Sequence, residues 1–137
     1  MAARNSISQA YRPVQDVLAA SIIQSSSGHY NTSGYSCGGH YTFWWSATYT
    51  TFFLANLEMS TQGYWNFCYS ATITSLTPAV TGAATWTFTD GVIGNGSAKA
   101  NPWINWYGSN VLLCCSETYL ERWYVTSNGA WTWNVWH

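Results

Sequence analysis

The sequence predicts an all-β fold: a single-domain antiparallel β-sandwich or jelly roll with a short N-terminal helix or arm. Three observations favour it. Aromatic residues make up 18% of the 137 residues, with 10 Trp and 10 Tyr, and such side chains suit a pleated, half-buried surface. Long stretches alternate between apolar and polar residues, and turn signals separate them without helical periodicity after residue 24. A closed barrel is the second architecture that these signals allow.

The N-terminal segment differs from the remainder of the chain. After Pro13, apolar residues recur at helical spacing as far as Ile22, and proline favours a first helical position. We therefore expect an arm or short helix over residues 1–24 and a β-sandwich domain over residues 25–137. An extended segment that pairs with the sheet edge of another chain is the alternative.

The central segments carry the period-two pattern. Residues 24–40 are rich in Ser and Gly and predict a loop, whereas Tyr41–Phe53 predicts one long strand, or two strands broken near Ala47. A turn is expected at Ser60–Gly63, followed by a strand whose apolar face runs from Trp65 to Ile73. Pro78 should end that region, because proline cannot donate to a central ladder.

Shorter strands are expected further along the chain. Trp86 and Phe88 alternate with threonines and predict an inward-facing pair, and Val111–Ser116 predicts a further strand. At the C-terminus, Asn128 and Gly129 suit a two-residue type I′ hairpin. That turn would pair Tyr124 with Trp133, which puts tryptophans on both faces of the hairpin.

Charge is scarce and nearly balanced. Charged residues make up 7% of the chain and the net charge is −1. Four basic residues are few for phosphate binding, so we expect no nucleic-acid partner. No apolar run approaches the roughly 20 residues that a spanning helix needs, so we expect no membrane insertion. The uncharged polar composition indicates an extracellular or virion-surface location.

Few residues could carry catalysis or bind a metal. The five carboxylates show no spacing typical of a catalytic pair, and Gly-x-Ser-x-Gly is absent. His29, Cys37 and His40 resemble half of a zinc site, but the second half is missing. We therefore expect no enzyme, no catalytic residue, no metal and no cofactor.

The four cysteines leave several alternatives open. Cys37, Cys68, Cys114 and Cys115 could be small buried side chains, or could form one or two disulfides. Cys114 and Cys115 are adjacent and so are poor partners for each other. One of them could reach Cys37 or Cys68, and the sequence does not choose between these pairings.

The aromatic surplus is the feature that points to function. More large rings occur than one core needs, and exposed clusters of them mark interfaces or ligand surfaces. We predict a non-enzymatic structural or adhesive protein that self-assembles into a filament, fibre or virion component through its N-terminal segment and its aromatic faces. The alternative is a glycan-binding, lectin-like module, because rings stack on sugars while amides and hydroxyls bind sugar hydroxyls. The predicted contact residues are Trp44, Phe52, Trp103, Trp106, Trp123, Trp131 and Trp136.

Overall fold

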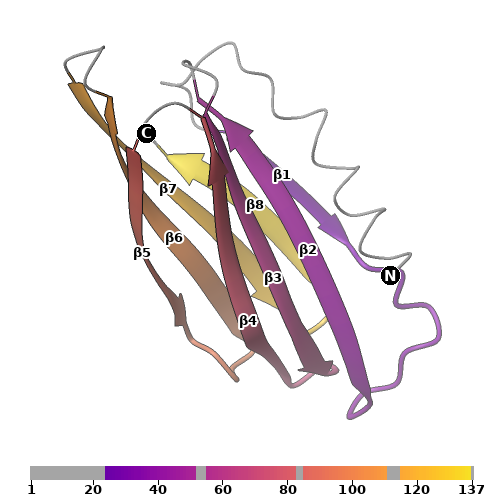
Figure 1. The fold of residues 1–137 in the computed structure, drawn as a ribbon. Helices are drawn as coiled ribbons and strands as arrows, with labels where there is room; N and C mark the ends of the chain where they lie inside the picture. Colours follow the sequence, from indigo (N-terminus) through magenta and orange to yellow (C-terminus); the bar gives the residue numbers. More distant parts are fainter. Residues whose placement is uncertain (1–23, 52–54, 83–84, 111–114, 137) are drawn as a thin grey trace.

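The chain folds into two antiparallel sheets packed face to face, which confirms the predicted β-sandwich (Figure 1). The computed structural model describes residues 24–51, 55–82, 85–110 and 115–136. Within this part, no helix is long and apolar enough to cross a membrane. The expected arm over residues 1–24 lies almost entirely outside it. The strands are β1 (Gln24–His29), β2 (His40–Thr50), β3 (Asn56–Asn66), β4 (Ser70–Thr81), β5 (Thr85–Ile93), β6 (Lys99–Asn110), β7 (Cys115–Thr126) and β8 (Ala130–Trp136).

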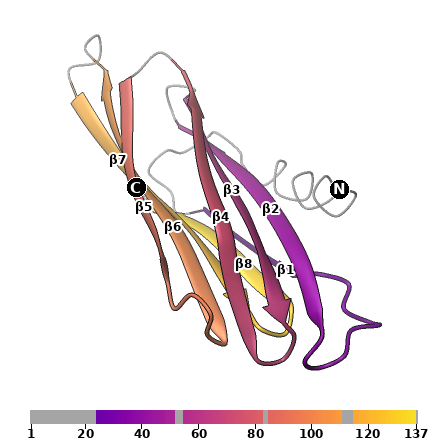
Figure 2. The same ribbon diagram turned by 60° about the horizontal axis from the view of Figure 1, so that its bottom comes forward.

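The two sheets have unequal numbers of strands. One has five, in the order β1-β8-β7-β6-β5, and the other has three, in the order β2-β3-β4. Strands β2 to β4 and β5 to β8 are therefore two consecutive meanders, and β1 joins the second by pairing with β8. Figure 2 shows the narrower sheet lying over only part of the wider one.

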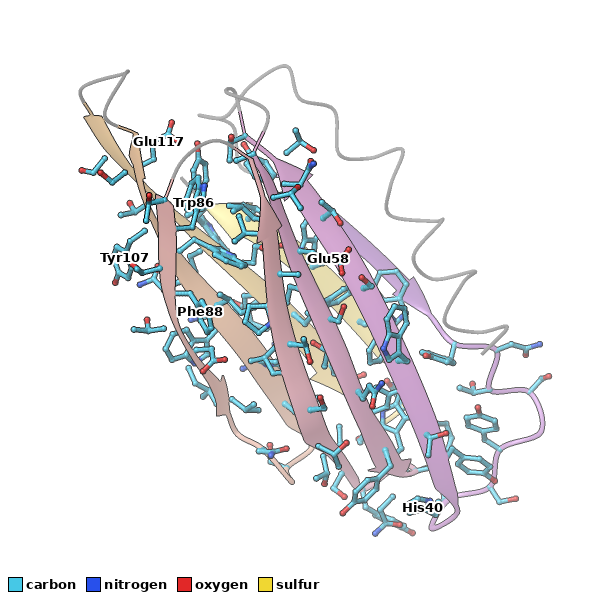
Figure 3. All side chains as sticks on the ribbon, viewed as in Figure 1. His40, Glu58, Trp86, Phe88, Tyr107 and Glu117 are labelled. Atoms are coloured by element: carbon cyan, nitrogen blue, oxygen red, sulfur yellow. A yellow bond between two sulfur atoms is a disulfide. The ribbon has the colours of Figure 1, made fainter. Side chains whose placement is uncertain are left out.

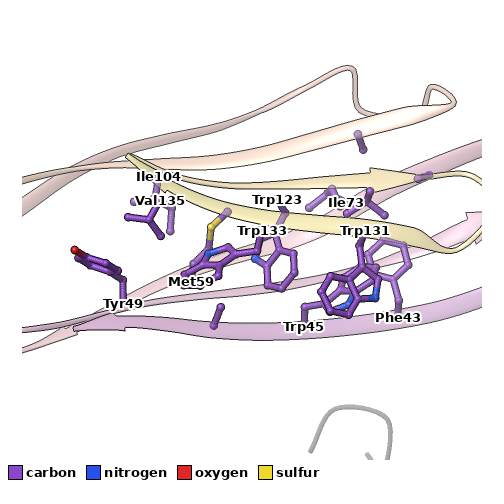
Figure 4. Packing of buried hydrophobic residues seen from close by; sticks show 14 of the residues in the cluster. Phe43, Trp45, Tyr49, Met59, Ile73, Ile104, Trp123, Trp131, Trp133 and Val135 are labelled. Atoms are coloured by element: carbon purple, nitrogen blue, oxygen red, sulfur yellow. The ribbon is translucent and has the colours of Figure 1, made fainter. Parts of the chain in front are cut away.

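The core between the sheets consists largely of aromatic rings (Figure 4). The odd-numbered residues of β2, β3 and β7 point inward, as the period of two requires. Trp45 of the narrow sheet packs on Trp123 of the wide sheet, with ring centroids 5.6 Å apart. The tryptophans that are completely buried are Trp45, Trp65, Trp106, Trp123 and Trp133.

Glycines opposite aromatic residues make room for several of these rings. Gly28 pairs with Trp131 and Gly108 pairs with Trp86. In both pairs a Cβ on the glycine would lie 2.5 Å from the indole. The ring therefore lies flat across the neighbouring strand, on a surface that only glycine leaves open. Such pairs allow a sheet to hold large rings in neighbouring strands.

The structure corrects several predicted strand boundaries. Residues 24–40 are not all loop, because β1 pairs with β8. The predicted turn at Ser60–Gly63 lies inside β3, where Gly63 pairs with Phe43. The chain turns instead at residues 67–69, between β3 and β4. Pro78 lies within β4 and does not end it, which is possible because β4 is an edge strand.

The C-terminal hairpin has a different turn from the predicted one. The Gly129 amide donates to the Thr126 carbonyl, and Gly129 has a φ of 90°, whereas Asn128 has no positive φ. The loop thus holds three residues, and the type I′ prediction is wrong. Trp123 consequently pairs with Trp133. This shift of one residue moves Trp131 and Trp133 to the face of Trp123, inside the core.

One end of the sandwich is tied together by a disulfide and hydrogen bonds. Cys37 and Cys68 form the disulfide, which selects one of the pairings that the sequence left open. Cys37 therefore has no free thiolate for a zinc site. The Cys68 amide donates to the Ser127 carbonyl at 3.0 Å. Asn95 reaches the narrow sheet as well, since its side chain accepts from the amide of Ile73 and donates to the carbonyl of Ile73.

Candidate functional site

The outer face of the five-stranded sheet carries a group of partly exposed aromatic and amide side chains. Register places Trp103, Arg122 and Asn134 side by side on β6, β7 and β8. The adjacent row holds Asn105, Leu120 and Trp136. We call this surface the outer face; its contact residues are Lys99, Trp103, Asn105, Arg122, Tyr124 and Trp136.

Arg122 lies at the centre of the outer face, between aromatic rings. Its Nη1 donates to the Tyr124 hydroxyl at 3.0 Å. Its Cζ lies 5.7 Å from the Tyr124 ring centroid and 5.9 Å from that of Trp136. Lys99 also approaches Tyr124, with Nζ 4.8 Å from the ring centroid. These distances fit cation–π contacts, which hold both cations close to the aromatic surface.

Trp103 forms a platform on the same face. Its partner in register is Gly91 of β5. A Cβ on Gly91 would lie 2.9 Å from Trp103 Cζ2, so the indole lies directly over the glycine backbone. The ring is half-buried. One side of the indole therefore packs on the sheet, while the rest of the ring stays partly exposed and can contact a ligand.

The positively and negatively charged residues that the structure describes lie on different surfaces of the molecule. Both described cations, Lys99 and Arg122, belong to the outer face. Glu58 lies on the narrow sheet (Figure 3), opposite Thr48. Asp90 of β5 and Glu117 of β7 pair in register with core-facing residues of β6, so both lie on the core side of the wide sheet. Together with buried Glu121, this leaves the outer face with positive charge and no described carboxylate.

Glu121 is a carboxyl group inside the aromatic core. It is completely buried, and its Oε1 accepts a hydrogen bond from Trp106 Nε1 at 2.8 Å. Burial raises the pKa of Glu121 well above its ordinary value, and the indole hydrogen bonds only partly oppose this rise. The fold therefore favours the protonated, neutral form of Glu121. Because Glu121 has no access to solvent, its carboxyl group forms a hydrogen bond inside the core and cannot donate a proton to a bound molecule.

A second surface arises because the narrow sheet leaves β5 uncovered. Among the strands of the wide sheet, β4 packs chiefly on β6 and makes few contacts with β5. Phe88 points to the core side of β5, and its ring lies 5.7 Å from that of Trp106, yet it is 47% exposed (Figure 3). Trp86 and Val92 share this side and are half-buried. We call this surface the β5 edge; β5 also has no hydrogen-bonded neighbour beyond it among the described strands.

A hollow on the narrow sheet is lined by three threonines, one amide, one carboxylate and two apolar residues. Its volume is about 540 Å³, and Thr48, Glu58 and Thr81 are among the lining residues. The Thr48 hydroxyl donates to Glu58 at 3.3 Å, and Asn56 donates to Thr81 at 3.2 Å. The hollow contains one carboxylate, so its lining does not supply an acid–base pair. The described residues also contain no group of three or more His, Cys, Asp or Glu that could hold a metal ion.

The predicted contact residues divide into four groups. Trp103 and Trp136 lie on the outer face, and Trp44 is half-buried on the narrow sheet. Trp106, Trp123 and Trp131 are core residues with exposures of 0%, 0% and 5%, so they do not form a surface. The reason is register: each lies on the inward side of its strand. Phe52 lies outside the described residues.

Sequence reasoning did not select Lys99, Asn105, Arg122 and Tyr124 for the outer face. The alternation of Arg122 and Tyr124 with Trp123 and Val125 was the available signal, because it separates two faces of β7. The sequence did not show which of these two faces would be exposed, because that depends on the register of the C-terminal hairpin. The chain matches no family model, no curated protein and no solved structure.

Proposed function

We propose that the protein is a non-enzymatic structural or adhesive domain that self-assembles through the β5 edge. The observation that carries this proposal is the core side of β5, where Phe88 is 47% exposed beside the buried ring of Trp106 and Trp86 and Val92 are half-buried; Asp90 is the one charged residue on this side. A second copy would cover this side. The Cys37–Cys68 disulfide and the scarcity of charge support an extracellular or virion-surface setting.

The backbone of β5 supports the same proposal. An edge strand presents unpaired amide and carbonyl groups, and proteins that stay monomeric usually protect it with lysine, proline or a bulge. β5 has nine residues, and Asp90 is its one charged side chain. The net charge of −1 also gives little electrostatic repulsion between copies. The N-terminal segment, residues 1–24, is proposed as a further contact.

Light scattering coupled to size-exclusion chromatography tests the assembly. We expect the full chain to form oligomers whose mass rises with concentration. Phe88→Lys should shift them toward monomer, because full burial of a Phe side chain contributes about 1.5–3 kcal/mol and a charge would oppose it. Tyr69→Lys is the matched control, since Tyr69 is 61% exposed and lies in the β3–β4 turn.

Two outcomes would contradict the proposal. A full-length protein that stays monomeric at high concentration, and is unchanged when residues 1–24 are removed, would exclude self-assembly. Oligomers of Phe88→Lys as stable as those of the original protein would exclude the β5 edge as their contact. Circular dichroism of both variants verifies that the sandwich is folded in each case.

The second candidate function is glycan binding at the outer face. The observation that favours it is the platform of Trp103 over Gly91, next to Asn105 and Asn134. Indoles cover the apolar face of a pyranose ring, and amides bind its hydroxyl groups. A glycan array tests this function, with Trp103→Ala as the site variant. Absence of any bound sugar would argue against it.

A further inference from the structure

We infer that the outer face binds oligosaccharides that carry carboxylate groups. This inference rests on the second candidate function and names the class of sugar. A carboxylate would meet the Arg122 guanidinium at the centre of the face, while the sugar rings stack on the neighbouring indoles.

The charge distribution favours an acidic sugar over a neutral one. Lys99 and Arg122 are the two described cations, and both contact the ring of Tyr124. The described carboxylates lie in the core, on the narrow sheet or on the core side of β5 and β7. An anion on the outer face therefore meets attraction without nearby repulsion, and a guanidinium can bind a carboxylate through two hydrogen bonds.

The spacing of the rings favours an oligosaccharide over a single sugar. Trp103 and Trp136 lie on β6 and β8, separated by β7. Neighbouring strands are about 4.8 Å apart, so the backbones of Trp103 and Trp136 are roughly 10 Å apart across the sheet, and the Trp103 indole leans further away from Trp136 over Gly91 of β5. Arg122 occupies the strand between them. A ligand that contacts both indoles and the guanidinium must therefore span more than one sugar ring.

The aromatic rings and two cations of the outer face do not favour nucleic acid as its ligand. Single strands stack bases on aromatic side chains, but they also need a positively charged groove that follows the phosphates. Lys99 and Arg122 neutralise at most two phosphates, so the electrostatic contribution to affinity would be small. A carboxylate of a sugar acid can instead be bound by a single guanidinium.

Isothermal titration of the full chain tests the inference with three carboxylated oligosaccharides, from pectin, hyaluronan and a sialylated milk sugar. Each is compared with its methyl ester, which keeps the rings and removes the charge. We expect at least one acid to bind about tenfold more tightly than its ester, as one charge-assisted contact would give. Arg122→Gln and Lys99→Gln should reduce this preference, and Trp103→Ala should weaken acid and ester alike.

The control is Trp44→Ala, which removes a half-buried indole from the opposite sheet and should leave binding unchanged. Equal affinity for acids and esters would overturn the inference and leave glycan binding in place. No binding of the acid panel, together with an empty glycan array, would overturn both. A thymidine oligonucleotide that binds as tightly as the acids would overturn the assignment to sugars.

Discussion

At the scale of single residues, the sandwich depends on a few side chains in unusual surroundings. Glu121 is a carboxyl group among core tryptophans. Tyr30 stands at the edge of the core, where its hydroxyl accepts from the Trp44 amide and donates to the Trp44 carbonyl. Burial raises the pKa of Tyr30 to about 12, so this pairing persists over the neutral range.

The buried carboxyl group should make stability depend on pH. The pKa of Glu121 is raised in the folded state, so its proton stabilises the fold below the ordinary pKa of glutamate. That contribution is lost as the pH rises from this value toward the folded pKa, by up to about 1.4 kcal/mol per pH unit. In urea unfolding between pH 4 and 8, we expect the original protein to lose stability relative to Glu121→Gln. Parallel curves would contradict a raised pKa of Glu121 in the folded state, and Asp90→Asn, which changes an exposed carboxylate, is the control.

Gly91 should control the position of the Trp103 platform. In Gly91→Ala the new Cβ would lie 2.9 Å from Trp103 Cζ2, so the indole must move away from the sheet. Gly91 has no positive φ, so alanine brings no backbone strain, and we expect stability to change by less than about 1 kcal/mol. Fluorine NMR of fluorotryptophan-labelled protein should show a shifted Trp103 resonance. An unchanged resonance would contradict the stacking, and Thr89→Ala is the control on the same face of β5.

At the scale of the elements, the C-terminal hairpin decides which tryptophans are buried. Its three-residue loop pairs Trp123 with Trp133 and Val125 with Trp131, so these four side chains face the narrow sheet. A two-residue loop would instead have turned Trp131 and Trp133 away from Trp123. The length of one loop thus determines the composition of both faces of β8.

Alanine substitutions in β8 should reveal this register. We expect Trp133→Ala to lower the free energy of unfolding by about 3–5 kcal/mol, as truncation of a buried tryptophan does. Trp136→Ala should cost much less, because Trp136 is half-buried on the outer face. Chemical denaturation measures both values. Similar costs for the two variants would contradict the observed pairing.

At the scale of the whole molecule, one end of the sandwich is tied and one edge is open. At one end, the disulfide joins the β1–β2 loop to the β3–β4 turn, and Asn95 joins the β5–β6 loop to β4. The unequal widths of the sheets leave β5 uncovered at the side. The disulfide restricts the conformations of the unfolded chain. The uncovered β5 leaves apolar surface that another copy of the chain could bury.

Loss of the disulfide should be costly. Its cysteines are 31 residues apart, and closing a loop of that length contributes about 3–4 kcal/mol in the chain-entropy description. The variant with Cys37→Ala and Cys68→Ala should lose about this much in thermal or urea unfolding. Cys68 also has a φ of 74°, so Cys68→Gly in place of Cys68→Ala should recover about 1 kcal/mol. Equal stability of the two double variants would contradict strain at this position.

The sequence by itself determined the fold class and the chemistry of the strand faces. Alternation such as Phe43, Trp45 and Ala47 against Thr42 and Thr48 depends only on neighbours along the chain, because successive side chains point to opposite faces. The predicted sandwich is therefore confirmed, and Trp103 and Trp136 do lie on an outer face.

Only the tertiary structure decided which rings form the core and which form the surface. Trp106, Trp123 and Trp131 are buried because of a hairpin register and sheet widths that involve residues far apart in the sequence. The glycines that receive the rings of Trp103 and Trp131 lie on neighbouring strands, and Cys37 finds Cys68 across 31 residues. A local pattern specifies that a strand has two faces, whereas burial depends on what packs against each face.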